Sequence, residues 1–459
     1  MARARSAPPA PRSLGMARES VHLPSLAPSL PSHWRWDRLD SACDGVFDCP
    51  HSTPTLTDEG PYIVRSQDIR SGMFRPEGAA HVSEETYRER IARAEPRRGD
   101  LLYSREGTYF GIAAEVPEGT RVCLGQRMVL LRPNASVVDS RFVRYWLNSP
   151  TMAAHIHGHR DGSVAERLNL PTIRALPVAL PPLTEQRAIA QILGTLDDKI
   201  ELNRRMNETL ESIARSLFKS WFVDFDPVRA KAEGRDPGLP KPLADLFSDS
   251  FEDSALGEIP KGWDVRSLAE MARFLNGLAL QKYPPRDAVF LPVIKIAQLR
   301  AGDTAGADRA SADLDPEYIV RDGDILFSWS GSLECAVWAG GSGALNQHLF
   351  KVTSSTHPRW LCYLGIHQHL DAFRHIASGK ATTMGHIQRH HLSDARLPFP
   401  SPALLRAIDA VMEPIFESIW RRRVQSRTLA TIRDALLPKL VSGAVGLRDS
   451  VGCMMDPRP

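Results

Sequence analysis

The 459-residue sequence has few cysteines, no large excess of charge of either sign and no long apolar segment. Six cysteines spread along such a chain are typical of a cytosolic protein without a disulfide framework. Since no run of about 18 apolar residues occurs, we expect no membrane-spanning helix and a cytoplasmic location. The formal net charge of +3 is small, so any nucleic-acid binding must come from local clusters of basic residues.

Sequence motifs of nucleotide and nucleic-acid enzymes are also missing. The only Gly-Lys pair, at 379–380, lacks the glycine and the hydroxyl residue that a phosphate-binding loop places around it. We find no amino-methyltransferase motif, glycine-rich cofactor fingerprint, nuclease pattern or nucleophile elbow. Cys43, Cys49 and His51 have no second ligand pair at the spacing of a metal site. We therefore expect no catalytic residues, no metal and no cofactor in this chain.

A long amphipathic segment at 182–225 lies in the middle of the chain. It opens with Thr184 and Glu185, a typical helix N-terminus in which threonine accepts an orphan N–H and the acid faces the positive end of the dipole. Apolar residues then recur at steps of three and four, which predicts a helix on the order of 55 Å long that needs a partner helix. The helix-pairing residues that we assign to its seam are Ile189, Ile192, Leu196, Asn203, Leu210, Ile213 and Leu217.

The pattern that surrounds this helix occurs twice. A globular unit at 30–181 begins with LPSHWRWDRL, and a second one at 258–400 begins with IPKGWDVRSL. Within them RRGDLLYSREG (97–107) matches RDGDILFSWSG (321–331), and LGQRMVLL matches LNQHLFKV. Since the period is far longer than that of a solenoid repeat, we interpret the chain as a tandem duplication of a whole domain with its helix.

The second long helix, at 401–445, continues the match. Its seam residues are Ile408, Val411, Ile415, Ile419, Leu429, Ile432 and Leu436. Lys199 and Asn203 interrupt the first seam at the level where the second helix has the arginines 421–423 and Ser426. In an antiparallel pair these polar segments would meet and fix the register, although the arginines can equally be a solvated helix face.

The fold class that we predict is mixed α/β, with two tandem α/β domains separated by two long antiparallel coiled-coil-like helices and related by a pseudo-twofold axis. The extension at 1–29 lacks the apolar core of a secretory signal and should be disordered, and Met16 is an alternative start. Pro414 removes a backbone donor and should kink or restart the second helix. The expected order is the extension, the domain at 30–181, the helix at 182–225, a linker at 226–257 that is mostly loop with at most one short helix, the domain at 258–400, the helix at 401–445 and a tail at 446–459.

Polar and aromatic residues gather at matched turns of the two units, as a nucleic-acid surface would require. Glutamine and arginine can each bond two atoms of a base edge, of adenine and guanine respectively. The glycine-interrupted basic segments 155–169 and 375–391 are typical of phosphate-contacting loops. A solvated turn without a ligand is the alternative, and Asp100 and Asp324 are better interpreted as structural turn residues. The candidates for DNA contact are Ser104, Arg105, Tyr109, Gln126, Arg127, His157, Arg160, Ser163, Ser328, Trp329, Ser330, Gln347, His348, Lys380 and Thr382.

The helix opening PPLTEQRAI and the helix exit FKSWFVDFDPV, followed by SFEDSALGEIPKGW, resemble the central conserved region of the specificity (S) subunit of type I restriction–modification systems. The resemblance covers about residues 30–448. It implies two target-recognition domains that each read half of a split site in double-stranded DNA, held apart by the two conserved helices. One departure is that the second helix opens with SPALLRAI, so its docking face can differ from that of the first.

The resemblance also implies partners. Two modification methyltransferase subunits would dock on the chain, and restriction endonuclease–translocase subunits would join for cleavage. The chain itself would be non-catalytic, with S-adenosylmethionine bound by the modification subunits and ATP and Mg²⁺ by the restriction subunits. Because the two units differ strongly in sequence, the site should be bipartite and asymmetric. The alternatives are a coiled-coil structural adaptor without base-specific reading, and a fused modification enzyme, for which the motifs are missing.

Overall fold

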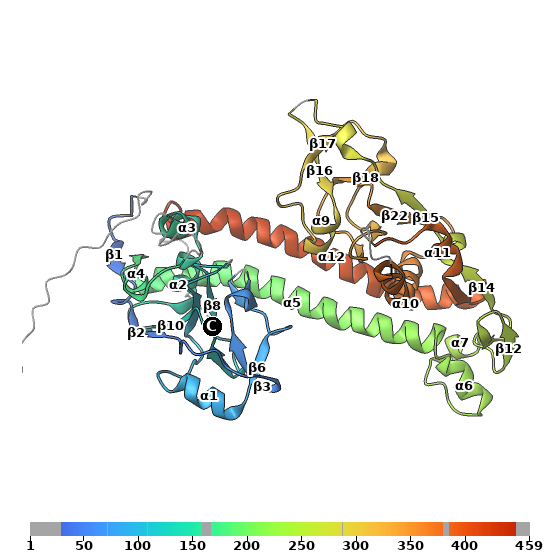
Figure 1. Ribbon diagram of the computed structural model, residues 1–459, viewed down its shortest axis with the longest axis horizontal. Coiled ribbons are helices and arrows are strands. Elements are labelled where there is room, and N and C mark those ends of the chain that lie inside the picture. The colour runs from blue at the N-terminus through green and yellow to red at the C-terminus, as the bar shows by residue number, and fades with distance from the viewer. Residues whose placement is uncertain are drawn as a thin grey trace, which may run out of the picture. The chain divides into compact units, whose positions relative to one another are not determined.

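The computed structural model describes residues 29–446 except Ser71, Thr108, 158–166, Asp287 and 380–384, so the expected extension and most of the tail lie outside the described residues. The chain divides into two compact units, 1–196 with 432–459 and 197–431. Figure 1 labels many of their elements. In the described part, no helix is both long and apolar enough to cross a membrane.

The globular domain of the first unit contains a four-stranded sheet, a three-stranded sheet, two strand pairs and several short helices. One sheet is antiparallel, in the order β2 (Cys43–Asp48), β10 (Met128–Pro133), β7 (Leu101–Ser104) and β8 (Ala113–Glu115). The other has the order β6 (Ala80–Val82), β3 (Leu56–Val64) and β9 (Val122–Leu124), and β3 and β9 are parallel. β1 (Arg35–Arg38) pairs with β11 (Pro177–Leu180), so the first and last strands of the domain meet. The remaining elements are η1 (Ser66–Asp68), β4 (Ile69–Arg70), β5 (Met73–Phe74), α1 (Glu84–Ile91), α2 (Ser140–Leu147), α3 (Pro150–His157) and α4 (Leu170–Arg174).

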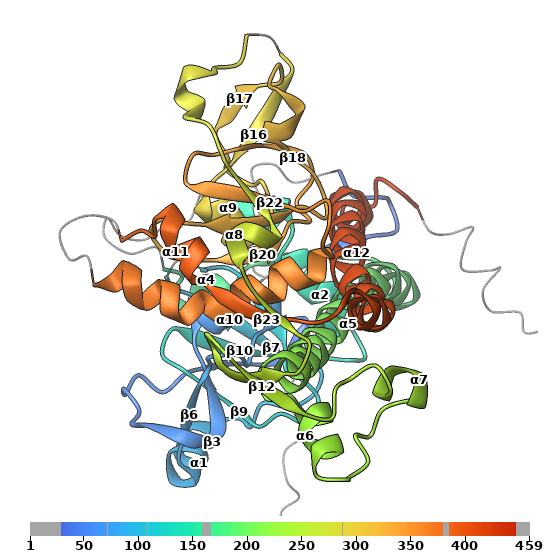
Figure 2. The same ribbon diagram turned by 90° about the vertical axis from the view of Figure 1, so that its right-hand side faces the viewer.

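The second unit repeats this topology. Its antiparallel sheet has the order β15 (Arg273–Asn276), β22 (Leu349–Thr353), β19 (Ile325–Ser328) and β20 (Cys335–Val337). The other sheet has the order β17 (Arg309–Ser311), β16 (Phe290–Ile294), β21 (Gly343–Leu345) and β18 (Ile319–Val320), with β16 and β21 parallel. β14 (Asp264–Ser267) pairs with β23 (Arg396–Phe399), as β1 does with β11. Figures 1 and 2 show the β16 sheet farther from α10 (Arg359–Ser378) than the β22 sheet is.

Short elements complete the second unit and occupy much of the connector at 226–257. The connector was expected to be mostly loop with at most one short helix, and it contains two short helices and a strand. Val228, Leu243 and Phe247 are buried in the core of the unit and order the segment around them. These elements are α6 (Asp226–Ala232), α7 (Lys241–Ala244), β12 (Phe251–Ser254), β13 (Gly257–Pro260), α8 (Leu268–Met271), η2 (Leu280–Lys282), α9 (Ile296–Ala301), η3 (Pro316–Tyr318) and α11 (Arg389–Asp394).

The strand register confirms the duplication at the level of single residues. Ser104 pairs with Met128 in the first unit, and Ser328 pairs with Leu349 at the matched positions of the second. The two turn aspartates are structural, as predicted. Asp100 accepts a bond from the backbone N–H of Arg97 and lies 2.7 Å from Arg132 Nη2. In the same way, Asp324 accepts from the N–H of Arg321 and lies 2.9 Å from Lys351 Nζ.

Two helices of 40 residues each, α5 (Leu183–Phe222) and α12 (Pro402–Val441), match the predicted long segments. At 1.5 Å per residue each is about 60 Å long. The first turn of α5 also holds its domain, because Glu185 Oε2 accepts bonds from the Trp34 indole N–H at 3.2 Å and from His33 at 2.9 Å. α12 continues through Pro414, so the predicted restart is wrong. Proline has no N–H, so the carbonyl of Ala410, one turn earlier, loses its helical hydrogen bond. Both Pro414 and Ala410 are exposed, so water can bond to that carbonyl.

The buried stripe of α5 lies about one residue away from the predicted seam. Ile192 and Ile213 are 37% and 43% exposed, and Lys199 is also exposed, whereas Ile189 is buried. On α12, Val411 and Ile432 are 38% and 44% exposed, while Ile408 and Ile419 are buried. The other predicted apolar seam residues are half-buried, namely Leu196, Leu210, Leu217, Ile415, Leu429 and Leu436. The buried positions that the prediction missed include Ala190, Leu193, Asp197, Asn207, Ala214, Phe218, Trp221, Met412 and Phe416.

Within the second unit, α5 and α12 meet through polar groups. Asn203 is fully buried, and its Nδ2 donates to Gln425 Oε1 at 2.9 Å and to Ser426 Oγ at 3.2 Å, so the predicted meeting of Asn203 with Ser426 is observed. Arg423 donates to Glu211 Oε1 at 2.6 Å and to the carbonyl of Val337 at 3.3 Å. Arg421 is 65% exposed and, among the described residues, forms its ion pair along its own helix with Glu417. The solvated-face interpretation therefore holds for Arg421 and is wrong for Arg423.

A second arginine of α12 binds the globular part of this unit. Arg427 makes a bidentate ion pair with Asp322, the shorter contact being 2.7 Å, and donates to the carbonyl of Ala339. The hydrogen bond from Arg427 holds the pKa of Asp322 below its ordinary value of 3.8. Because this pKa is lowered on folding, the pair stabilises fully at neutral pH and is lost only as the pH falls through the lowered pKa.

We predict that Arg427→Ala destabilises the second unit by about 1–2 kcal/mol at pH 7, as expected for a partly exposed charge-assisted pair. Thermal unfolding monitored by tryptophan fluorescence would measure the change. The control is Arg421→Ala, which removes an exposed arginine from the same helix and should have little effect. The difference between Arg427→Ala and the unsubstituted protein should persist from pH 7 to pH 5 and narrow only below about pH 4. Equal destabilisation by both substitutions would contradict the assignment.

Candidate nucleic-acid interface

The turn after β7 is held by backbone bonds to two other segments of the first unit. The N–H of Arg105 donates to the carbonyl of Arg127 at 3.0 Å, and the N–H of Leu168 donates to the carbonyl of Arg105 at 2.9 Å. Ser104 is fully buried, so its hydroxyl is removed from the surface groups that can reach a base. The main chain therefore fixes the turn, and the side chains of Arg105 and its neighbours are left to vary.

Charged side chains dominate this turn. Arg105 lies 3.0 Å from Asp48 Oδ1 at the end of β2, and both side chains are largely buried. Arg127 lies 3.3 Å from Glu106, is 56% exposed and has a φ of 72°, a left-handed conformation that arginine rarely adopts. Gln126 donates to the carbonyl of His51 at 2.6 Å and to Thr53 at 3.1 Å, so its Oε1 is left as an acceptor.

A hollow of about 240 Å³ lies beside this group, and its lining includes Arg65, Gln67, Gln126 and Arg127. Tyr109 lies apart from these side chains, with its ring 5.8 Å from the guanidinium of Arg70. The exposed Arg127 and the half-buried Gln126 thus form the accessible rim of the first turn.

The turn after β19 in the second unit has the same backbone bonds. The N–H of Trp329 donates to the carbonyl of His348 at 3.3 Å, and the N–H of Ile387 donates to the carbonyl of Trp329 at 2.9 Å. Ser328 is fully buried and its hydroxyl donates to the carbonyl of Ser332 at 2.8 Å. Ser328, like Ser104, therefore closes the turn and is not a surface contact.

Neutral polar and aromatic groups replace the ion pairs in the second turn. The Trp329 indole N–H donates to Asn276 Oδ1 at 2.9 Å and to the carbonyl of Gln347 at 3.1 Å. Ser330 Oγ lies 2.9 Å from His348 Nδ1, and Gln347 Nε2 lies 3.3 Å from His348 Nε2. The structure thus gathers the predicted Trp329, Ser330, Gln347 and His348 into one hydrogen-bonded group.

Asp48 and Asn276 occupy equivalent positions in the two units. Asp48 pairs with Val129 at the end of β2, and Asn276 pairs with Phe350 at the end of β15. Each contacts the matched turn residue, Asp48 with Arg105 and Asn276 with Trp329. One position therefore carries an acid–guanidinium pair in the first unit and an amide–indole pair in the second. Sequence reasoning missed both partners, because each lies more than 50 residues before its turn.

The two basic segments return to these turns. Arg167 forms an isolated β-bridge with Glu106, and His386 forms one with Ser330. His157, at the end of α3, is exposed and its ring centre lies 6.0 Å from that of Phe110. The predicted contacts Arg160, Ser163, Lys380 and Thr382 lie outside the described residues.

Metal-ion ligation finds no support in the described ranges, where no three His, Cys, Asp or Glu side chains come together as a ligand group. Cys43, Cys49, Cys123, Cys335 and Cys362 are free cysteines. Burial raises the pKa of the Cys123 and Cys362 thiols to about 11, so both are protonated and unreactive at neutral pH. The candidate residues at the two turns therefore interact by hydrogen bonds and ion pairs.

Comparison with known proteins identifies the family. The type I restriction modification DNA specificity domain matches residues 61–212 and again 260–405. The MjaIX specificity subunit of Methanocaldococcus jannaschii is 27% identical over 420 residues, which cover 88% of each chain. The HindI specificity subunit of Haemophilus influenzae is 24% identical over 406 residues, covering 76% of this chain and 87% of that one.

A solved structure shares the fold. The S subunit of a type I restriction–modification system from M. genitalium is 13% identical, with a TM-score of 0.52 over 91% of this chain and 99% of that one. The match to the specificity domain covers well over half of the sequence, in two regions that correspond to the two observed repeats. The chain therefore belongs to the type I restriction–modification DNA specificity family and is a specificity subunit with two target-recognition domains.

Proposed function

We propose that the chain reads an asymmetric bipartite DNA site, one half-site with each recognition domain. The observation that carries this proposal is the contrast at the two turns, where the same backbone bonds present different side chains. The Arg105–Asp48 pair occupies the position of Trp329–Asn276, and Arg127 occupies that of His348. Because arginine favours a guanine edge, whereas an imidazole and an indole do not offer its fork of donors, two such turns would select different bases.

The long helices would set the distance between the half-sites. α5 is one uninterrupted helix whose first residues belong to the first unit and whose later residues belong to the second. A rigid helix would convert its length into a fixed half-site spacing on the duplex. The buried contact of Asn203 with Gln425 and Ser426 would keep α5 and α12 in one register.

The proposed partners are two modification methyltransferase subunits, joined by restriction endonuclease–translocase subunits for cleavage. Exposed apolar side chains on the long helices, such as Ile192, Leu202, Ile213 and Val411, would offer them a docking surface. The chain would be non-catalytic. S-adenosylmethionine would be bound by the modification subunits, and ATP and Mg²⁺ by the restriction subunits.

The two docking faces would differ where the helices begin. In α5, Gln186 is buried and its side chain accepts a bond from the N–H of Asp139 at 2.9 Å and donates to the carbonyl of Pro181 at 2.9 Å. α12 begins with a weaker side-chain cap, in which Ser401 Oγ accepts from the N–H of Leu404 at 3.4 Å. The start of α5 is therefore bound more firmly to its domain.

We predict that a host expressing this chain with its methyltransferase shows one methylated DNA motif made of two different half-sites with a fixed gap. Each recognition domain supplies one half-site and the helix length sets the gap, which is why both features should occur together. Methylome sequencing of that host would measure the motif, and the same host without this chain is the control. A continuous or palindromic motif would count against the proposal. A complex that bound DNA without sequence preference would favour the structural adaptor.

We predict that replacing residues 30–180 with the corresponding domain of another family member changes only one half-site. The expectation follows from the separate cores of the two domains, since β1 pairs with β11 inside the exchanged segment. The reciprocal exchange of 258–400 is the matched control and should change only the other half. Methylome sequencing again measures the motif. A change of both half-sites after one exchange would contradict the proposal that each domain reads its half-site independently.

A further inference from the structure

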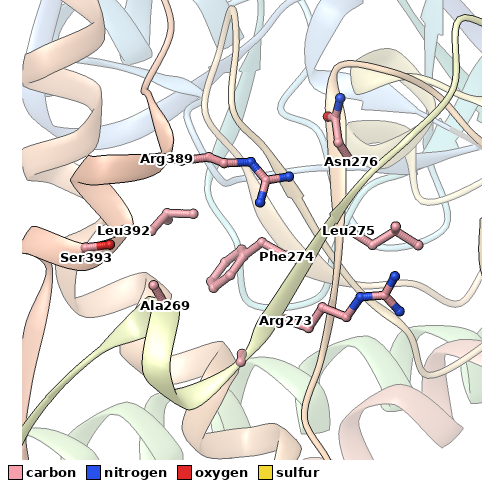
Figure 3. A pocket seen from close by; sticks show the side chains of 9 residues that line it. Ala269, Arg273, Phe274, Leu275, Asn276, Arg389, Leu392 and Ser393 are labelled. Atoms are coloured by element: carbon pink, nitrogen blue, oxygen red, sulfur yellow. The ribbon is translucent and has the colours of Figure 1, made fainter.

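A hollow of about 410 Å³ lies next to the second turn, between the end of α8, β15 and α11 (Figure 3). Its floor is apolar, because Phe274 and Leu392 are buried. Its polar lining comes from Arg389, Asn276, Ser393 and Arg273. Figure 3 shows Arg389 and the Phe274 ring on one side of the β15 ribbon, while the Arg273 side chain extends on the other side.

Arg389 is the arginine of this hollow whose charge is not balanced by an ion pair to a described residue. Its side chain is exposed, and within the described ranges it makes neither an ion pair nor a hydrogen bond. Its guanidinium carbon lies 5.9 Å from the centre of the Phe350 ring, a cation–π distance that holds the group beside the turn. Arg273, by contrast, is partly neutralised by Glu317 at 2.8 Å.

The other polar groups also offer donors. The indole N–H of Trp329 can only donate, so its bond to Asn276 Oδ1 fixes the orientation of that amide. The Asn276 NH₂ group is then left as a donor at one edge of the hollow, and the hydroxyl of Ser393 lies at the opposite side, beyond Leu392 (Figure 3). No carboxylate is among the lining residues. A ligand of this hollow should therefore bear oxygen acceptors and a negative charge.

Shape decides between the two acceptor groups of DNA. Base edges are recessed in a groove and are reached by protruding side chains, whereas backbone phosphates protrude and can enter a hollow. We propose that this hollow is a seat for a DNA backbone phosphate beside the second half-site, held by Arg389 and Asn276. The inference rests on the proposed function. Asn276 lines this seat and also accepts a hydrogen bond from Trp329 in the base-reading turn. A phosphate bound in the seat would therefore fix the register of that turn on the duplex.

The described part of the first unit differs at the position that supplies this donor. Asp48 stands at the position of Asn276, and its carboxylate, engaged by Arg105, would repel a phosphate. The seat is therefore a property of the second recognition domain.

The test uses Arg389→Gln in the chain co-purified with its modification methyltransferase, titrated with a duplex that carries the methylated motif. We expect the affinity to fall about 10- to 100-fold, as for a lost charged hydrogen bond. The slope of log K against log salt should become shallower by about 0.9, because one phosphate contact is lost. Arg389→Lys should keep the slope, since the positive charge remains. Preference among duplexes with single base-pair changes in the second half-site should stay the same.

The matched control is Arg321→Gln, which removes an exposed arginine before β19, at the strand end opposite the reading turn. It should leave both affinity and salt slope unchanged, and thermal unfolding checks that both variants are folded. An unchanged affinity and slope in Arg389→Gln would overturn the seat. A relaxed preference at one base pair would also overturn it, because Arg389 would then read a base. Failure of the unsubstituted complex to prefer its motif over a scrambled duplex would instead defeat the proposed function.

Discussion

Main-chain hydrogen bonds at the ends of β7 and β19 are the constraint on which the two candidate DNA-contact turns depend. In each unit the turn residue bonds the residue that follows the matched glutamine and the segment that returns from the basic loop. A fully buried serine, Ser104 or Ser328, precedes the turn residue in each unit. Because these bonds use backbone atoms, they remain when the side chains change. A stable scaffold can therefore carry an ion pair at one copy and an amide–indole pair at the other.

The long helices and the duplication could be predicted from the sequence because both depend on local spacing. The exact seam of α5 could not. Its buried positions include Ala190, Asp197 and Asn207, which a search for large apolar residues passes over. Close helix packing favours small residues, and buried polar groups are tolerated where a partner exists. The contact of Asn203 with the second helix was predictable only because Ser426 lies at the corresponding position of that helix in an antiparallel pair. The Arg423–Glu211 contact joins residues 212 apart in sequence and left no local signal.

The candidate site was predictable in the same limited way. Matching the two repeats located Arg105, Gln126, Trp329 and Gln347, because the turns have the same length in both copies. It did not separate Ser104 and Ser328 as buried closing groups, since a hydroxyl in a polar turn looks the same whether it faces in or out. Partners such as Asp48 and Asn276 come from sheet pairing, which only the folded structure shows.

The pairing of β1 with β11, and of β14 with β23, places the first and last strands of each recognition domain side by side. A domain whose ends meet can be exchanged as a cassette between related genes with little disturbance of what flanks it. Stepwise change is harder, because replacing Arg105 alone removes the guanidinium from the largely buried Asp48 and leaves it only the exposed His51, 3.3 Å away. New DNA specificities should therefore arise more readily by recombination of entire domains than by accumulation of point mutations.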